Sequence, residues 1–127
     1  MVDVLDRPET LDPKLRALLD DEEATEQYVY CAQCSNVLAR CDAAIEINGA
    51  HTHFCVNPHG IEFDVRCYAQ ALGCAIAGEP TAADSWFPGY RWRFASCASC
   101  QIHLGWLFQG AEHQFYGLIN DRIQSDG

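Results

Sequence analysis

Apolar and polar residues alternate along much of this chain from Tyr28 onward. In three stretches almost every second residue is apolar or aromatic, namely 61–67, 90–94 and 102–108. A period of two places such residues on one face of a half-buried strand. The pattern therefore predicts a mostly β, mostly antiparallel domain.

A hairpin and a closing strand extend this predicted sheet. Asn48-Gly49 accepts the two positive φ angles of a type I′ turn, so we expect a hairpin between 44–47 and 50–56. The segment 115–119 is predicted to be the closing strand. The pattern over 68–77 is weaker, and the following Gly78-Glu79-Pro80 is expected to lead into a loop.

Residues 1–25 differ from the rest, and we expect an acidic N-terminal segment followed by one β domain over 26–127. Asp12-Pro13 suits the cap and first position of a helix. Three leucines then follow at helical spacing: Leu15, Leu18 and Leu19. We predict a short helix that packs on the domain or frays from it, with the acidic run 20–23 in solvent.

The three tryptophans are concentrated around one turn and the two strands after it. Pro88 presets the first central position of a turn and Gly89 supplies the positive φ of the second, which places Trp86 on a loop. The aromatic residues of the next two strands are predicted to join Trp86 as the walls of a box: Trp92, Trp106 and Phe108.

Such a box admits three interpretations. Tryptophans are most simply hydrophobic core. A set of π faces also binds an alkylated ammonium group by cation–π attraction, or a flat neutral ring by apolar contact and a few backbone hydrogen bonds. The acidic composition favours the cation, and the residues alone leave the choice between the two ligands open.

Composition excludes several classes of partner. The chain has 127 residues, enough for one domain with a core, and a formal net charge of −10. Phosphates and anionic membranes would be repelled, so we expect neither a nucleic acid nor a membrane partner. No apolar run is long enough to span a bilayer, and the first residues lack the features of a secretory signal, which predicts a cytoplasmic protein.

Four of the eight cysteines form two C-x-x-C pairs, Cys31 with Cys34 and Cys97 with Cys100. In a reducing compartment such pairs indicate metal ligation, and disulfides or a redox dithiol are the alternative. Four thiolates make the closed tetrahedral sphere of a structural Zn²⁺ site. We therefore expect a metal that stabilises the fold and takes no part in catalysis.

The other four cysteines have no paired spacing: Cys41, Cys55, Cys67 and Cys74. Free cysteine is among the most buried residue types, so we interpret them as small core residues. A second metal site formed by His51, His53 and Cys55 is a less favoured alternative.

The motifs together resemble the CULT family, the thalidomide-binding domain of cereblon, in its single-domain bacterial form. The resemblance runs from about Tyr28 to about Arg122 and is carried by the first C-x-x-C pair and four later motifs: Asn57-Pro58-His59-Gly60, Ser85-Trp86-Phe87-Pro88-Gly89-Tyr90-x-Trp92, Cys97-x-x-Cys100 and Gly105-Trp106-x-Phe108. It implies a β-tent of two antiparallel sheets that meet at an angle near a four-cysteine zinc site. It also implies that three tryptophans form the pocket walls, with Phe108 at the base.

The resemblance supplies a ligand class as well. It implies cyclic imides of the glutarimide or thalidomide type, uracil-like rings, and C-terminal cyclic imides of proteins. The backbone carbonyl of Asp84 would accept the imide N–H, and the backbone N–H of Trp86 would donate to an imide carbonyl. Asn57 would add a side-chain contact at the rim, beside Pro58. Animal cereblon usually has His at the position of Asp84, so a carboxylate here would alter the preference for charged substituents.

We expect a monomeric binding module and no enzyme. The B-type methionine sulfoxide reductases have a related fold, but their catalytic cysteine follows the second C-x-x-C pair, and no cysteine follows Cys100 here. A hydrolase of imide rings that uses His59 or Asp84 to activate water is the alternative. The further domains of cereblon have no room in this chain, so no ubiquitin ligase partner is inferred.

Overall fold

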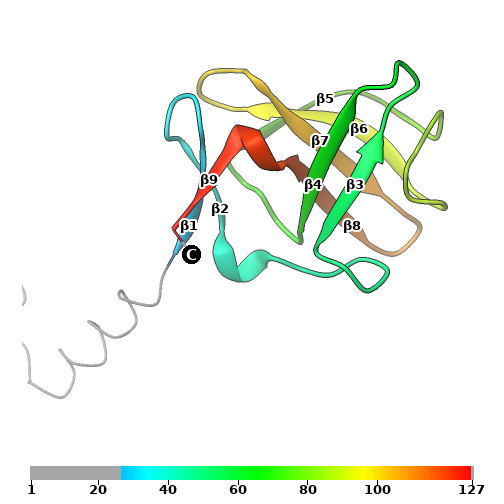
Figure 1. Ribbon diagram of the computed structural model, residues 1–127, viewed down its shortest axis with the longest axis horizontal. Coiled ribbons are helices and arrows are strands. Elements are labelled where there is room, and N and C mark those ends of the chain that lie inside the picture. Colours follow the sequence, from blue (N-terminus) through cyan, green and yellow to red (C-terminus); the bar gives the residue numbers. More distant parts are fainter. Residues whose placement is uncertain (1–26, 127) are drawn as a thin grey trace, which may run out of the picture.

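The computed structural model describes residues 27–126, which fold into nine strands and two short 3-10 turns (Figure 1). The strands are β1 (Tyr28–Cys31), β2 (Val37–Arg40), β3 (Thr52–Val56), β4 (Glu62–Tyr68), β5 (Cys74–Thr81), β6 (Arg91–Cys97), β7 (His103–Gln109), β8 (Gln114–Ile119) and β9 (Ile123–Ser125), and the turns are η2 (Cys41–Ala43) and η3 (Asn120–Arg122). The predicted N-terminal helix lies outside the described residues. Within 27–126, no helix is long and apolar enough to cross a membrane.

The strands form two antiparallel sheets, which confirms the predicted mostly β fold. The small sheet has the order β2-β1-β9, and the large sheet has the order β3-β4-β8-β7-β6-β5. The small sheet therefore pairs the first described strands with the last one, and Figure 1 shows it at one end of the large sheet.

One hydrophobic cluster joins the two sheets. Val29, Leu38 and Ile123 come from the three strands of the small sheet, and Leu104 and Leu118 come from β7 and β8 of the large sheet. Each of these side chains is at most 7% exposed. Burial of an aliphatic side chain contributes about 1.5–3 kcal/mol, so this cluster holds the sheets together.

The hairpin prediction is correct at its turn and wrong for its first strand. Asn48 and Gly49 have φ angles of 53° and 86°, and Ile47 pairs with Ala50 across them. Residues 44–47 form only isolated bridges, Ile47 with Ala50 and Ala44 with Tyr68, and two imidazole rings contact carbonyl oxygens of this segment. His51 Nδ1 lies 3.0 Å from the Ile45 carbonyl oxygen, and His53 Nε2 lies 2.9 Å from that of Ile47.

Two further findings concern strands. Gly78-Glu79-Pro80 leads into the loop as expected, but it does so as part of β5, whose pairing with β6 shifts register between Ala77 and Thr81. Proline is tolerated there because β5 is an edge strand with no partner on its outer side. The predicted closing strand exists as β8, but it lies inside the large sheet, between β4 and β7.

Replacing Gly117 with alanine should destabilise the fold beneath the tryptophans. A Cβ at this position of β8 would lie 2.6 Å from Val65 Cγ1 and 2.9 Å from Phe108 Cε2, both in a packed core. Overpacking of this kind costs about 1–3 kcal/mol. We expect a lower thermal midpoint by circular dichroism. An unchanged midpoint would show that the side chains around Gly117 move aside for the added methyl group without loss of stability.

Candidate functional site

The loop between β5 and β6 is a rigid turn whose shape comes from its own polar groups. The Ser85 N–H donates to the Ala82 carbonyl at 3.2 Å, and Asp84 takes the left-handed conformation with φ 56°. The Tyr90 N–H then donates to the Phe87 carbonyl across Pro88-Gly89, where Gly89 has φ 89°. The predicted turn is confirmed, and it holds Trp86 on the loop.

Two indole hydrogen bonds tie this loop to its surroundings. Trp86 Nε1 donates to the Val56 carbonyl at the end of β3, at 2.9 Å. Trp92 Nε1, from β6, donates to the Ala83 carbonyl in the loop, at 2.8 Å. The polar edge of each ring is therefore satisfied, and its faces remain available for apolar contact.

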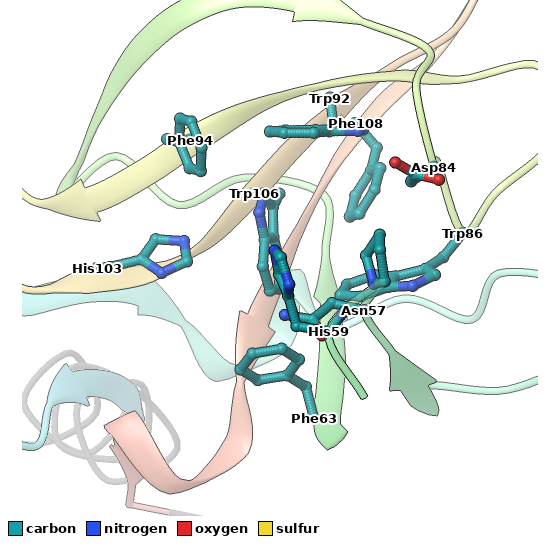
Figure 2. Close-up of a pocket in the computed structure, with 11 residues that line it drawn as sticks. Asn57, His59, Phe63, Asp84, Trp86, Trp92, Phe94, His103, Trp106 and Phe108 are labelled. Carbon is teal, nitrogen blue, oxygen red and sulfur yellow. The ribbon is translucent and has the colours of Figure 1, made fainter. Parts of the chain in front are cut away.

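The rings gather around one cavity of about 430 Å³ (Figure 2). Trp86 and Trp106 meet edge to face, with centroids 4.8 Å apart at 86°. All seven pocket residues predicted from the sequence line this cavity: Asn57, Pro58, Asp84, Trp86, Trp92, Trp106 and Phe108. The structure therefore brings the predicted site residues together.

A second aromatic layer supports the base of the cavity. Phe108 packs against Phe87 at 4.8 Å and stacks on Phe115 at 5.1 Å. All three rings are at most 3% exposed. The base of the pocket is thus part of the core and rigid.

Three lining residues were not predicted, namely Phe63, Phe94 and His103, and the fourth additional one, His59, was named only for the hydrolase alternative. Phe94 lies two residues after Trp92 on β6, so strand alternation could have placed it on the same face. His103 could not be placed in this way, because the β6–β7 pairing shifts register between Ala95 and Ser96. This bulge leaves Leu104 without a partner in the β6–β7 register and sets His103 opposite Ser96, on the face that carries Trp106.

Asn57 forms hydrogen bonds through the oxygen of its side-chain amide and not through the nitrogen, within the described residues. Its Oδ1 accepts from the backbone N–H groups of His59 and Ile61, both at 2.9 Å, and so shapes the β3–β4 turn. Within residues 27–126, its Nδ2 makes no hydrogen bond. Asn57 therefore offers donors at the rim of the cavity.

Two main-chain groups beside the tryptophans are also unpaired. In the described part of the chain, no hydrogen bond engages the carbonyl of Asp84 or the backbone N–H of Trp86. An unpaired acceptor and an unpaired donor thus lie two residues apart on the loop. Such groups favour a ligand that offers the complementary donor and acceptor.

The four paired cysteines form a cluster between the two sheets. Their sulfur atoms all lie within 4.8 Å of one another. Cys31 Sγ lies 3.7 Å from Cys100 Sγ, and Cys34 Sγ lies 3.6 Å from Cys97 Sγ. In tetrahedral zinc–thiolate sites, bonds of about 2.3 Å place the sulfurs about 3.8 Å apart. The spacing fits one metal ion and is far too long for disulfides.

The two C-x-x-C turns have the same backbone hydrogen bonds. The Ser35 N–H donates to the Cys31 carbonyl and the Gln101 N–H to the Cys97 carbonyl. Ser35 and Gln101 also share a positive φ, of 66° and 68°. Each turn thereby presents both of its sulfur atoms to the same point.

Electrostatics suits this cluster to a cation. Burial raises the pKa of Cys31 to about 11. Burial would also raise the pKa of Cys97, but hydrogen bonds from the N–H groups of Cys100 and Ser99 outweigh it and lower that pKa to about 6. A neighbouring positive charge favours thiolates, and a metal ion among the four sulfurs would supply that charge.

The remaining cysteines are not part of this cluster, although Cys74 pairs with Cys97 across β5 and β6. Burial is the main cause that raises the pKa of Cys55 to about 11 and those of Cys67 and Cys74 to about 12. Such thiols stay protonated and unreactive at neutral pH. Cys41 is partly exposed, and its sulfur lies 3.2 Å from the Ser125 hydroxyl oxygen.

No family model matches this chain. Protein cereblon of Drosophila pseudoobscura pseudoobscura is 34% identical over 108 residues, which cover 78% of this chain and 17% of the relative. Protein cereblon of Drosophila virilis is 32% identical over 117 residues, which cover 84% of this chain and 18% of the relative. The chain thus spans less than a fifth of the length of these relatives.

A solved structure shares the fold. The crystal structure of the Mis18 'Yippee-like' domain matches with a TM-score of 0.56 and 11% identity, over 81% of this chain and 97% of that domain. At this identity the likeness concerns the fold alone. The similarity to cereblon extends over about four fifths of this chain and supports a cereblon-like CULT domain.

Proposed function

We propose that this domain binds a neutral cyclic imide or a uracil-like ring in the aromatic cavity. The observation that carries the proposal is the pair of unpaired main-chain groups, the carbonyl of Asp84 and the N–H of Trp86, beside the tryptophan walls. An imide has one N–H donor between two carbonyl acceptors. The N–H would pair with Asp84, and one carbonyl would pair with Trp86.

The rest of the cavity suits the rest of such a ring. The faces of Trp86, Trp92 and Trp106 would cover the ring carbons, which have no hydrogen-bonding groups. The free amide donors of Asn57 would serve the second carbonyl. A C-terminal cyclic imide of a protein has the same ring and is a candidate natural ligand.

We propose Zn²⁺ as the metal of the cysteine cluster. Four thiolates in tetrahedral spacing are a typical structural zinc set, with no position left for a substrate. Cys31 ends β1 in the small sheet and Cys97 ends β6 in the large sheet. The ion would therefore fasten the two sheets to each other, away from the cavity.

We propose a binding module and not an enzyme. The residues that line the cavity include no serine, threonine, cysteine, lysine or tyrosine that could act as a nucleophile. His59 and Asp84 remain as groups that could activate water, so the hydrolase alternative needs its own test. Incubation with glutarimide followed by mass spectrometry should return the intact ring, and ring-opened product above the rate in buffer would favour the hydrolase.

Methylation of the imide nitrogen should abolish most binding. The Asp84 carbonyl would then face a methyl group and remain buried without a donor, which costs about 1–3 kcal/mol, or about 5- to 150-fold in Kd. We expect glutarimide to bind with a Kd in the micromolar range, about −8 kcal/mol, and N-methylglutarimide to bind at least tenfold more weakly by isothermal titration calorimetry.

The control ligand is an isomer that carries the methyl group on a ring carbon, because it adds the same volume and keeps the N–H. A trimethylated lysine peptide tests the cation alternative, which the exposed carboxylate of Asp84 would favour. Binding of that peptide without binding of glutarimide would replace the proposal with an ammonium cage.

A further inference from the structure

The four cysteines of the metal cluster differ in their exposure to solvent. Cys31 and Cys97 are 0% exposed, and Cys100 is partly buried. Cys34 is exposed, and it is the only exposed one of the eight cysteines, which all lie in the described part of the chain. The whole turn from 32 to 35 between β1 and β2 is exposed as well. A small solute can therefore approach the cluster from the Cys34 side.

A second sulfur lies directly beside Cys34. Cys34 Sγ is 3.6 Å from Cys97 Sγ, which belongs to the other C-x-x-C turn. The N–H groups of Ser99 and Cys100 and the side-chain amide of Asn36 contact Cys97 Sγ at 3.4–3.5 Å. These contacts hold the buried sulfur in place, so that a small movement of Cys34 is enough to bring the two sulfurs to bonding distance.

Exposure and a close second sulfur are the features of a redox-sensitive thiol site. The thiolate is the reactive form of cysteine, and coordination to a metal keeps a thiol deprotonated. Cysteines that respond to oxidants are accessible thiolates with another cysteine nearby to complete a disulfide. With a metal ion in the cluster, Cys34 meets each of these conditions. Cys55 and Cys67 do not, because both are buried outside the cluster.

We propose that Cys34 is an oxidation site for hydrogen peroxide, and that its conversion to a Cys34–Cys97 disulfide releases the metal. The Cys34 thiolate attacks one peroxide oxygen, so that a sulfur–oxygen bond forms, the oxygen–oxygen bond breaks and hydroxide leaves. The Cys97 thiolate then attacks the sulfur of this sulfenic acid, forms the disulfide and releases a second hydroxide. The two sulfurs lose two electrons, and the peroxide gains them.

The position of this disulfide would make the change reversible. Cys34 lies in the turn after β1 of the small sheet, and Cys97 ends β6 of the large sheet. A bond between these two turns keeps the sheets linked after the metal leaves, whereas a disulfide between Cys31 and Cys34 would stay within one turn. A thiol reductant would break the bond between the turns and restore the four ligands. The domain would thus exchange a metal for a disulfide without losing the link between its sheets.

The first test treats the full chain, purified with zinc, with hydrogen peroxide. A chromogenic chelator should record the release of about one zinc ion per chain. Peptide mapping by mass spectrometry should find Cys34 joined to Cys97, with Cys55 and Cys67 still reduced. Dithiothreitol with added zinc should restore the metal content. Zinc release with Cys34 still reduced, or a disulfide that joins Cys34 to Cys31, would overturn the proposal.

This inference rests on the proposed Zn²⁺ site, and the two fail in different ways. The metal content before treatment tests the zinc site, because an untreated chain without metal would refute it. The disulfide map after treatment tests the oxidation site. A chain that holds zinc and keeps all four cluster thiols reduced in peroxide would refute the oxidation site alone.

A ligand exchange tests the role of Cys34 separately. Cys34→His removes the exposed sulfur and keeps four ligands, because three cysteines and one histidine are also a common structural zinc set. We expect zinc release by peroxide to slow by at least about tenfold. Cys100→His is the matched control, since it makes the same exchange at a partly buried ligand, and it should release zinc about as fast as the wild type. Equal protection by both variants would refute entry at Cys34, and if Cys34→His binds no zinc, the disulfide map of the wild type decides.

Discussion

Cys97→Ser is expected to release the metal and to abolish cooperative folding of the domain. Cys97 is fully buried, and its sulfur accepts hydrogen bonds from Ser99, Cys100 and Asn36 at 3.4–3.5 Å. Structural zinc contributes about 10–16 kcal/mol in zinc-finger peptides, which is comparable with the whole stability of a domain, about 5–15 kcal/mol. Elemental analysis should find about one zinc per chain in the wild type and almost none in the variant, and circular dichroism should show no sharp melting transition.

Cys41→Ser is the matched control, because it makes the same chemical change outside the cluster. Cys41 is partly exposed and contacts Ser125, a contact that a serine hydroxyl can retain. We expect full metal content and a change in unfolding free energy below about 1 kcal/mol. A Cys97→Ser protein that bound metal and melted like the wild type would contradict the structural role of the cluster.

The fold could be predicted from the sequence where local chemistry decides it. Alternation identified β4, β6 and β7, and the two turns at Asn48-Gly49 and Pro88-Gly89 formed as their residues require. The strand expected at 44–47 is not continuous, because the Ile45 carbonyl contacts the His51 ring and Ala44 pairs with Tyr68. Such side-chain competition depends on tertiary contacts that a periodic pattern does not contain.

The site was largely predictable because its residues come from strong motifs. The tryptophans, the C-x-x-C pairs and Asn57 all lie where the resemblance implied. His103 was missed for a physical reason, since the bulge between β6 and β7 reverses the face that alternation would assign. The resemblance implied ligand contacts for Asn57, the Asp84 carbonyl and the Trp86 N–H, but that these groups lack partners within residues 27–126 depends on the folded loops and not on the sequence pattern.

Trp86→Ala is expected to abolish measurable imide binding while the domain stays folded. Trp86 lies on a loop and is half-buried, so its loss removes a pocket wall without opening the core. Trp106→Ala is a poorer test, because that ring is only 8% exposed and belongs to the core. The lost apolar contact corresponds to about 2–4 kcal/mol, or about 30- to 1000-fold in Kd. Calorimetry with glutarimide measures the affinity, and thermal melting checks the fold.

Trp86→Phe separates the contribution of the aromatic ring at position 86 from that of the indole hydrogen bond to the Val56 carbonyl. Phenylalanine keeps an apolar ring beside Trp106 but loses the indole N–H that donates to the Val56 carbonyl. We expect binding weakened by about three- to thirtyfold, because the smaller ring covers less of the ligand and the loop loses one hydrogen bond. An equal loss of affinity in Trp86→Ala and Trp86→Phe would mean that binding depends on the indole hydrogen bond and not on the aromatic face. Wild-type affinity in Trp86→Ala would refute the proposed ring site altogether, since imides would then bind without the Trp86 ring.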